Sequence, residues 1–177
     1  MSATSQSLLD AINEDIALSA YDPSWPGLFA AERERLLARF PSALIAVEHI
    51  GSTAVPGLGA KPIIDMLAGV SSLAEADALV ELLCRSGYTT SAEFNATLPE
   101  SRWLMRWADG HRTHHLHLAI HGGPFWEKRL RFRDALRASP ELAARYLLLK
   151  TELASKYRTD REAYTDAKNE FVRSVVG

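Results

Sequence analysis

The sequence predicts an α/β (α+β) fold in which a mixed β-sheet is flanked by helices and followed by a helical C-terminal third. Two apolar runs rich in β-branched residues, at 43–50 and 63–70, predict strands. Two more strands are predicted at 102–108 and 113–120, because Asp109-Gly110 between them suits a tight hairpin turn. From residue 123 onward, apolar residues recur at helical spacing.

The length and composition indicate an ordinary globular protein. The 177 residues fit one domain spanning 1–177, in which the helices of 123–177 pack on the same core. The N-terminal segment 1–16 is expected to be an accessory, with a short helix at 7–16. A formal net charge of −2 argues against a nucleic-acid partner. The single Cys84 cannot form an intrachain disulfide, and the N-terminus lacks a leader pattern, so we expect a cytoplasmic protein. No apolar run approaches the roughly 20 residues of a membrane span, so no membrane partner is expected.

The first half of the chain alternates predicted helices and strands. Asp22-Pro23 is expected to begin a helix that reaches Phe40, with an apolar stripe that includes Leu28 and with the charged residues 32–35 facing outward. A helix is predicted over 73–84, ended by Gly87 before the next extended segment. Residues 91–100 carry little pattern and are expected to form a surface loop.

Three helices are predicted in the last third. In the first, over 123–138, Arg129, Arg133 and Arg137 lie one turn apart and form a cationic ridge, which is either solvated or turned toward a site. Ser139-Pro140 ends this helix and caps the next, over 140–155. The span 159–162 is expected to make a capping box for the last helix, and Lys168 flanks the apolar stripe of that helix.

The connection between the first two predicted strands has the composition of a shaped, anion-binding loop. Gly51 and other glycines permit backbone angles that side chains forbid, and prolines stiffen the path. Ser52 and Thr53 add hydroxyl groups beside Gly51, and Lys61 lies nearby to balance charge. A phosphate bound by amides and hydroxyls is the functional interpretation.

Asp65 is the single acid within the apolar run 63–67, where an isolated carboxylate is unfavourable unless a metal or another cation compensates it. The alternative is a tight Gly-Ser turn with an aspartate bonded to backbone amides. On the strand predicted at 113–120, strand alternation places His115 and His117 on one face and His114 on the other. Such a pair is suited to bind a metal or phosphate, and two satisfied core histidines are the alternative.

Together these stretches resemble a known family. Gly51-Ser52 followed by Asp65 resembles the nucleotidyltransferase superfamily signature, in which a Gly-Ser turn binds nucleotide phosphates and strand carboxylates hold a divalent metal. Five blocks over residues 18–173 resemble the GrpB family: YDPSWPGLF, GSTAVPGLGAKPIID, HHLHL, LRFRDALRASPELAARYLLLK and AYTDAKNEF. The resemblance implies a nucleotidyltransferase-like fold. It also implies a nucleotide or phosphorylated small molecule as ligand, and coenzyme A chemistry by association.

The chain departs from the superfamily pattern, because Leu67 stands where a second acid is usual. One interpretation is an enzyme in which Asp65 is catalytic and, with His115 and His117, holds one Mg²⁺ or Mn²⁺ that orients a nucleoside triphosphate for nucleotidyl transfer. The alternatives are a binding module without chemistry and a structural partner protein. The residues expected to contact the nucleotide are Gly51, Ser52, Thr53, Lys61, Arg129, Arg133 and Lys168.

Overall fold

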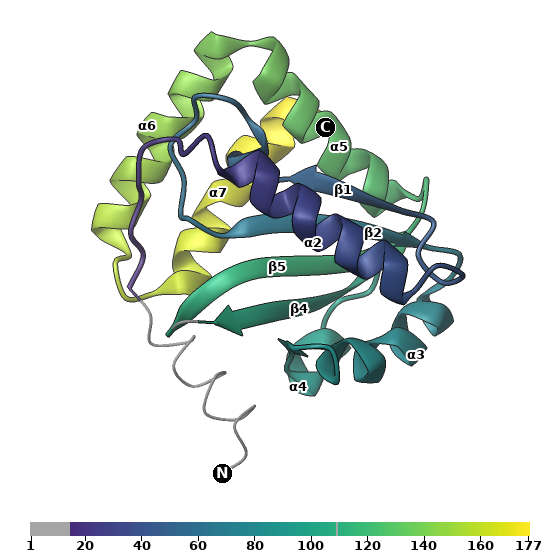
Figure 1. Cartoon of the computed structure of the whole chain (residues 1–177). Helices are drawn as coiled ribbons and strands as arrows, with labels where there is room; N and C mark the ends of the chain where they lie inside the picture. The colour runs from purple at the N-terminus through teal and green to yellow at the C-terminus, as the bar shows by residue number, and fades with distance from the viewer. Residues whose placement is uncertain (1–14, 109) are drawn as a thin grey trace.

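A five-stranded sheet organises the protein, whose computed structural model describes residues 15–108 and 110–177 (Figure 1). The strand order is β1-β2-β5-β4-β3. Strands β2 and β5 pair parallel, whereas the other neighbours pair antiparallel, so the predicted mixed sheet is confirmed. The strands are β1 (Ala46–Ile50), β2 (Ile64–Val70), β3 (Tyr88–Thr89), β4 (Ser101–Ala108) and β5 (His111–Ile120).

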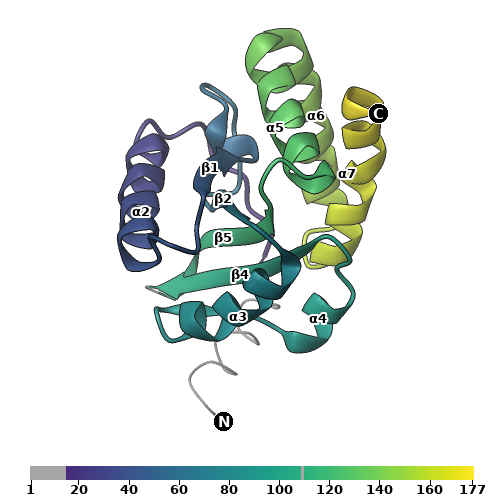
Figure 2. The same ribbon diagram turned by 90° about the vertical axis from the view of Figure 1, so that its right-hand side faces the viewer.

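Helices cover both faces of the sheet (Figure 2). Helices α2 and α3 pack on one face, and the consecutive helices α5, α6 and α7 gather on the other, which confirms the predicted helical C-terminal third. None of the helices in the described ranges is long and apolar enough to cross a membrane. The helices are α2 (Trp25–Arg39), α3 (Leu73–Cys84), α4 (Ala92–Ala96), α5 (Pro124–Ala138), α6 (Pro140–Lys156) and α7 (Arg161–Val176).

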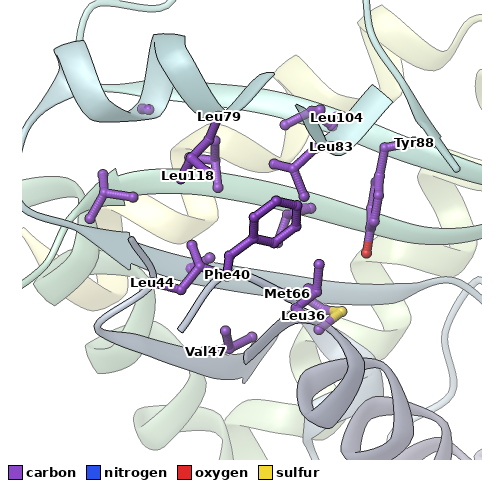
Figure 3. Packing of buried hydrophobic residues seen from close by; sticks show 14 of the residues in the cluster. Leu36, Phe40, Leu44, Val47, Met66, Leu79, Leu83, Tyr88, Leu104 and Leu118 are labelled. Atoms are coloured by element: carbon purple, nitrogen blue, oxygen red, sulfur yellow. The ribbon is translucent and has the colours of Figure 1, made fainter. Parts of the chain in front are cut away.

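The main core lies between the sheet and helices α2 and α3 (Figure 3). Alternate residues of β2 and β5, among them Met66 and Leu118, point into it and are fully buried. Leu36 of α2 and Leu83 of α3 meet them there with no exposed surface. The opposite residues of β2 and β5 face helices α5–α7, and that face carries the candidate site.

The charged residues 32–35 of helix α2 were expected to face outward, but Glu32 is buried, with 4% of its surface exposed. Its carboxylate accepts hydrogen bonds from Tyr88 Oη at 2.6 Å, Arg35 Nη2 at 2.6 Å and Arg106 Nη1 at 2.7 Å. Leu28, expected on the apolar stripe, is 50% exposed. The helix is therefore rotated so that an ion-paired acid, rather than Leu28, faces the sheet.

Two helix starts differ from their predicted positions, and one short helix occurs where a loop was expected. Helix α2 begins at Trp25, and Asp22 Oδ1 accepts a hydrogen bond from the Ser24 amide one residue before the helix. The expected loop at 91–100 contains the short helix α4, whose cap is the Ser91 side chain. Helix α7 is capped by Asp160, which accepts from the Ala163 amide. The accessory helix predicted at 7–16 falls almost wholly outside the described residues.

Candidate functional site

Asp65 and two histidines lie on the sheet face that helices α5–α7 cover. Asp65 of β2 pairs with His115 of the parallel strand β5, and Leu67 pairs with His117. Since side chains alternate along a strand, Asp65, His115 and His117 share a face, and His114 lies on the other. His115 Nδ1 lies 2.9 Å from Asp65 Oδ1. The structure thus places the three side chains on adjacent strands, with His115 and His117 on one face as strand alternation predicted.

The glycine-rich loop approaches Asp65 directly. Gly51 follows Ile50, the register partner of Asp65, and has a φ of 70°. A side-chain Cβ at Gly51 would lie 2.5 Å from Asp65 Oδ2, closer than real contacts allow. Glycine is therefore required at this position by both its backbone angle and its neighbour. Ser52 begins a 3-10 turn, Ser52–Ala54, immediately beside the carboxylate.

A buried lysine from α6 holds this loop. Lys150 is 3% exposed, and its Nζ donates to Ser52 Oγ at 3.0 Å and to the Gly59 carbonyl at 2.6 Å. The ammonium group also lies 5.1 Å from the ring centre of Tyr146, one helical turn earlier. Lys150 was not predicted as a site residue, although its place on the apolar stripe of a helix is a signal that sequence reasoning can use.

The same arrangement recurs on α7. Lys168 Nζ lies 4.1 Å from the ring centre of Tyr164, which is one turn earlier, and Lys61 Nζ lies 5.1 Å from that ring. Tyr164 is 1% exposed, and its hydroxyl has no hydrogen-bond partner in the described part of the protein. Burial, together with the negative charge of Asp65, raises the pKa of Tyr164 to about 12. Tyr164 is therefore a neutral, unpaired hydroxyl in the neighbourhood of Asp65.

Arg129 of α5 adds a fourth positive charge. Its guanidinium carbon lies 4.8 Å from the ring centre of Phe125, which in turn lies 5.9 Å from the His117 ring. Although the Arg129 side chain is exposed, surrounding protein lowers the pKa of the guanidinium, and Asp65 opposes that effect. We refer to Lys61, Arg129, Lys150 and Lys168, together with Asp65, as the cationic cluster.

Asp65 is ionised and His115 is neutral. Burial opposes ionisation of Asp65, but the hydrogen bond from His115 and the positive charge of Lys61 outweigh it and hold the pKa of Asp65 well below its ordinary value. Burial lowers the pKa of His115, and burial also lowers that of His117, to about 3. Because ionised Asp65 only accepts hydrogen bonds, the neutral His115 ring donates its Nδ1–H.

The lysines of the cluster repel one another. Burial is the main cause that lowers the pKa of Lys168 to about 7. The charges of Lys61, Lys150 and Arg129 contribute to this lowering, and Asp65 opposes it. Burial likewise lowers the pKa of Lys150 to about 8, against the influence of Asp65. The cluster thus concentrates positive charge that Asp65 alone does not balance. Such an arrangement is chemically suited to an anion with several negative oxygens.

Two residues predicted for the site point elsewhere. Thr53 is buried, and its Oγ1 lies 3.0 Å from His49 Nε2. His49 stacks on Phe29 of α2 at 4.7 Å between ring centres, so this pair belongs to the opposite face of the sheet. Arg133 donates to Glu48 Oε2 at 2.7 Å and to the His49 carbonyl at 3.1 Å, which ties α5 to β1. The structure does not bring Thr53 or Arg133 into the cationic cluster.

Asp65, His115 and His117, the predicted metal ligands, lie together on one face, but two of the three are bonded to each other. Within residues 15–108 and 110–177, no group of three or more His, Cys, Asp and Glu side chains is placed to hold a metal ion. His115 uses Nδ1 on Asp65 itself, so the two side chains satisfy each other. Metal ligation by this set stays a prediction.

Comparisons with known proteins agree on one family. The chain matches the family model described as GrpB protein over residues 15–177. It is 32% identical over 166 residues to the glutamate-rich protein GrpB of Alkalihalophilus pseudofirmus, which covers 92% of this chain and 94% of that protein. The crystal structure of GrpB from Enterococcus faecalis has a TM-score of 0.77 and 34% sequence identity, over 90% of this chain and 94% of that chain.

Other relatives are longer. The UPF0157 protein YqkA of Bacillus subtilis is 36% identical over 160 residues, which cover 90% of this chain and 46% of that protein, so the chain spans about half of its length. A dephospho-CoA kinase of Mycolicibacterium paratuberculosis is 33% identical over 180 residues, or 87% of this chain and 43% of that protein. Because the family model covers nearly the whole chain and relatives of matching length agree with it, the chain belongs to the GrpB protein family.

Proposed function

We propose that the cationic cluster binds the phosphate groups of a phosphorylated small molecule, with a nucleoside polyphosphate as the first candidate. The observation that carries this proposal is that Lys150 is bonded to Ser52 of the loop that abuts Asp65, while Lys61 and Lys168 both lie at the Tyr164 ring. The charge of Asp65 interacts with these lysines and with Arg129. Maintaining such charges close together is unfavourable in the free protein. A polyanion relieves their repulsion, and this relief favours binding.

The surrounding residues have distinct roles in this proposal. Lys150 holds the Ser52 hydroxyl and the loop backbone in place, so that the loop approaches the phosphates with little reorganisation. Lys168 and Lys61, which both lie near the buried Tyr164 ring, supply charge from α7 and from the loop. Asp65 limits the repulsion between the lysines when no ligand is bound.

Metal-dependent nucleotidyl transfer is the second candidate. The specific observation that favours it is an ionised Asp65 directly beside the Gly51-Ser52 turn, the pairing that the superfamily signature requires. In that reaction the four cations would stabilise charge developing on the transferred phosphoryl group. A bound divalent ion would supply further charge neutralisation. A binding module without catalytic activity would use the same four cations to bind phosphates but would form no product.

Calorimetric titration with ATP tests the binding proposal, and ³¹P NMR of the same mixtures with Mg²⁺ or Mn²⁺ tests for a product. We expect saturable binding that weakens as salt is added, because exposed parts of the cluster are screened. Dephospho-CoA belongs in the same series, since a region of proteins named dephospho-CoA kinase is similar to this chain. The absence of heat and of ³¹P shifts with every phosphorylated compound would reject the proposal.

A further inference from the structure

A tryptophan lies beside the cationic cluster on the same sheet face. Strands β4 and β5 pair antiparallel, with Trp103 opposite His117 and Met105 opposite His115. Trp103 therefore shares the face of the two histidines. Its ring centre lies 5.5 Å from that of His115, with the planes tilted by 58°. Because His115 is hydrogen-bonded to Asp65, Trp103 is separated from the cluster carboxylate by a single side chain.

The position of Trp103 is fixed by hydrogen bonds to its backbone. Its amide donates to Asn95 Oδ1 at 2.7 Å, and its carbonyl accepts from Asn95 Nδ2 at 3.2 Å and from Thr90 Oγ1. Asn95 is 8% exposed and comes from the short helix α4. Phe94 of the same helix packs edge-on against the Trp103 ring, at 5.6 Å between centres. The aromatic ring is thus held in place before any ligand binds.

Unlike the core tryptophans, Trp103 retains accessible surface. Trp25 and Trp126 are 3% and 4% exposed, whereas Trp103 is half-buried and the neighbouring Phe94 is 47% exposed. The main helix contacts of β4 are with α3, on the opposite face, and with α4. An anchored, partly accessible aromatic ring beside a concentration of positive charge combines the two features that recognise a nucleotide, an aromatic platform and cations for phosphates.

We propose that Trp103 is the stacking platform for the base of a nucleoside polyphosphate whose phosphates occupy the cationic cluster. This inference rests on the proposed function and deepens it by naming the residue that recognises the base. A phosphate site without such a platform does not distinguish a nucleotide from an inorganic polyphosphate. Stacking on an aromatic ring is available to every base, so the platform selects nucleotides without selecting one base strongly.

The test compares ATP with inorganic tripolyphosphate in calorimetric titrations of the wild type and of Trp103→Phe, Trp103→Leu and Trp107→Leu. Trp107 is the matched control, since it is a second half-buried tryptophan of β4. We expect Trp103→Leu to weaken ATP binding about tenfold while tripolyphosphate binding changes by less than about twofold. Trp103→Phe, which retains an aromatic ring, is expected to preserve most of the ATP affinity. Trp107→Leu is expected to change neither.

Tryptophan fluorescence gives a second measurement. Stacking predicts that ATP quenches the wild-type emission more than tripolyphosphate does, and that Trp103→Phe removes the difference. Equal losses of ATP and tripolyphosphate affinity in Trp103→Leu, no loss in either, or an equal effect of Trp107→Leu would overturn the platform while leaving the phosphate site intact. If neither ligand binds the wild type, the proposed function fails, and the platform fails with it. Thermal melts of each variant confirm that the titrated protein is folded.

Discussion

Lys150 Nζ on α6 donates a hydrogen bond of 3.0 Å to Ser52 Oγ, 98 residues earlier in the chain. This contact joins the C-terminal helices to the loop that links β1 and β2. It also places a buried ammonium group at Ser52, one of the two hydroxyls that the sequence pattern indicated beside Gly51. The proposed phosphate site therefore depends on two distant segments, and either one alone lacks part of it.

The Lys150 contact predicts unequal effects of two substitutions. Ser52→Ala removes one hydroxyl and is expected to weaken polyphosphate binding by about 1 kcal/mol, or roughly fivefold. Lys150→Met removes a charge as well as the anchor of Ser52 and Gly59, so it is expected to weaken binding more. Lys128→Met on α5 controls for the loss of one positive charge. If calorimetry shows equal losses of polyphosphate affinity in Lys128→Met and Lys150→Met, then only the net charge of the protein determines affinity.

Comparing Arg129 with Arg131 on α5 tests whether position in the cationic cluster, and not only positive charge, favours binding. The charge of Asp65 acts on the Arg129 guanidinium, whereas Arg131, two residues later, is exposed and has no such interaction among those described. We expect Arg129→Ala to lower tripolyphosphate affinity roughly fivefold and Arg131→Ala to lower it by less than about twofold. Equal losses would mean that the basic helix is only a diffuse positive surface.

Arg133 has a structural role, so its substitution is expected to lower stability and to leave tripolyphosphate affinity unchanged. Its guanidinium is bonded to Glu48, Asp134 and the His49 carbonyl. Arg133→Ala is expected to destabilise the fold by about 1–2 kcal/mol, because the buried carbonyl loses its donor, while Glu48 and Asp134 are partly solvated. Urea denaturation measures this loss. Affinity for tripolyphosphate is expected to stay close to the wild-type value when measured on folded protein.

The lowered lysine pKa values predict an unusual pH dependence. Lys168 has a pKa of about 7 and Lys150 a pKa of about 8 in the fold, below the ordinary value of 10.5. Between about pH 7 and 10 the unfolded chain therefore binds more protons, so the free energy of unfolding without ligand rises with pH. Polyphosphate affinity is expected to fall over the same interval, because binding favours the protonated lysines.

Urea denaturation at pH 7 and pH 9 measures the stability change. A Cys84→Ser background is the appropriate one, since burial raises the pKa of the Cys84 thiol and its titration acts in the opposite direction. Lys150→Met in that background is expected to show a smaller rise. Stability that stays level or falls from pH 7 to pH 9 contradicts the lowered pKa values of the cluster lysines.

Asp65→Asn tests the role of the carboxylate. We expect a lower melting temperature without added metal, because the substitution leaves the lysines less compensated and weakens the bond to His115. We also expect tighter tripolyphosphate binding, since a negative charge is removed from the cluster. A higher melting temperature for Asp65→Asn, or weaker binding without metal, would reject this role. If Mn²⁺ stabilises the wild type but not Asp65→Asn, the result would instead support the role of Asp65 as a metal ligand, which the sequence predicted.

Much of this architecture follows from local patterns in the sequence. Strand alternation alone separates His115 and His117 from His114, and the structure has this arrangement. Helices at 73–84, 123–138 and 140–155 were predicted within one residue of their observed ends. The burial of Glu32 was not predictable in this way, because its partners Tyr88 and Arg106 come from strands more than fifty residues away.

The site was only partly visible for the same reason. Lys168 was recognised from its spacing after Tyr164, and Lys150 has the same spacing after Tyr146, but nothing local shows that either lysine turns toward Ser52 and Asp65. That placement depends on how α6 and α7 fold back over the sheet. The periodicity of α5 likewise puts Arg129 and Arg133 on one ridge. Only tertiary packing determines that Arg133 donates a hydrogen bond to Glu48.

A crystal structure of the protein with a non-hydrolysable ATP analogue tests the central claim most directly. The account predicts triphosphate density within hydrogen-bonding distance of Lys150, Lys168 and Arg129, on the sheet face that carries Asp65. Such density would also show whether Ser52 contacts a phosphate oxygen. Nucleotide density on any other surface, with these three side chains unchanged and unoccupied by ligand, would contradict it.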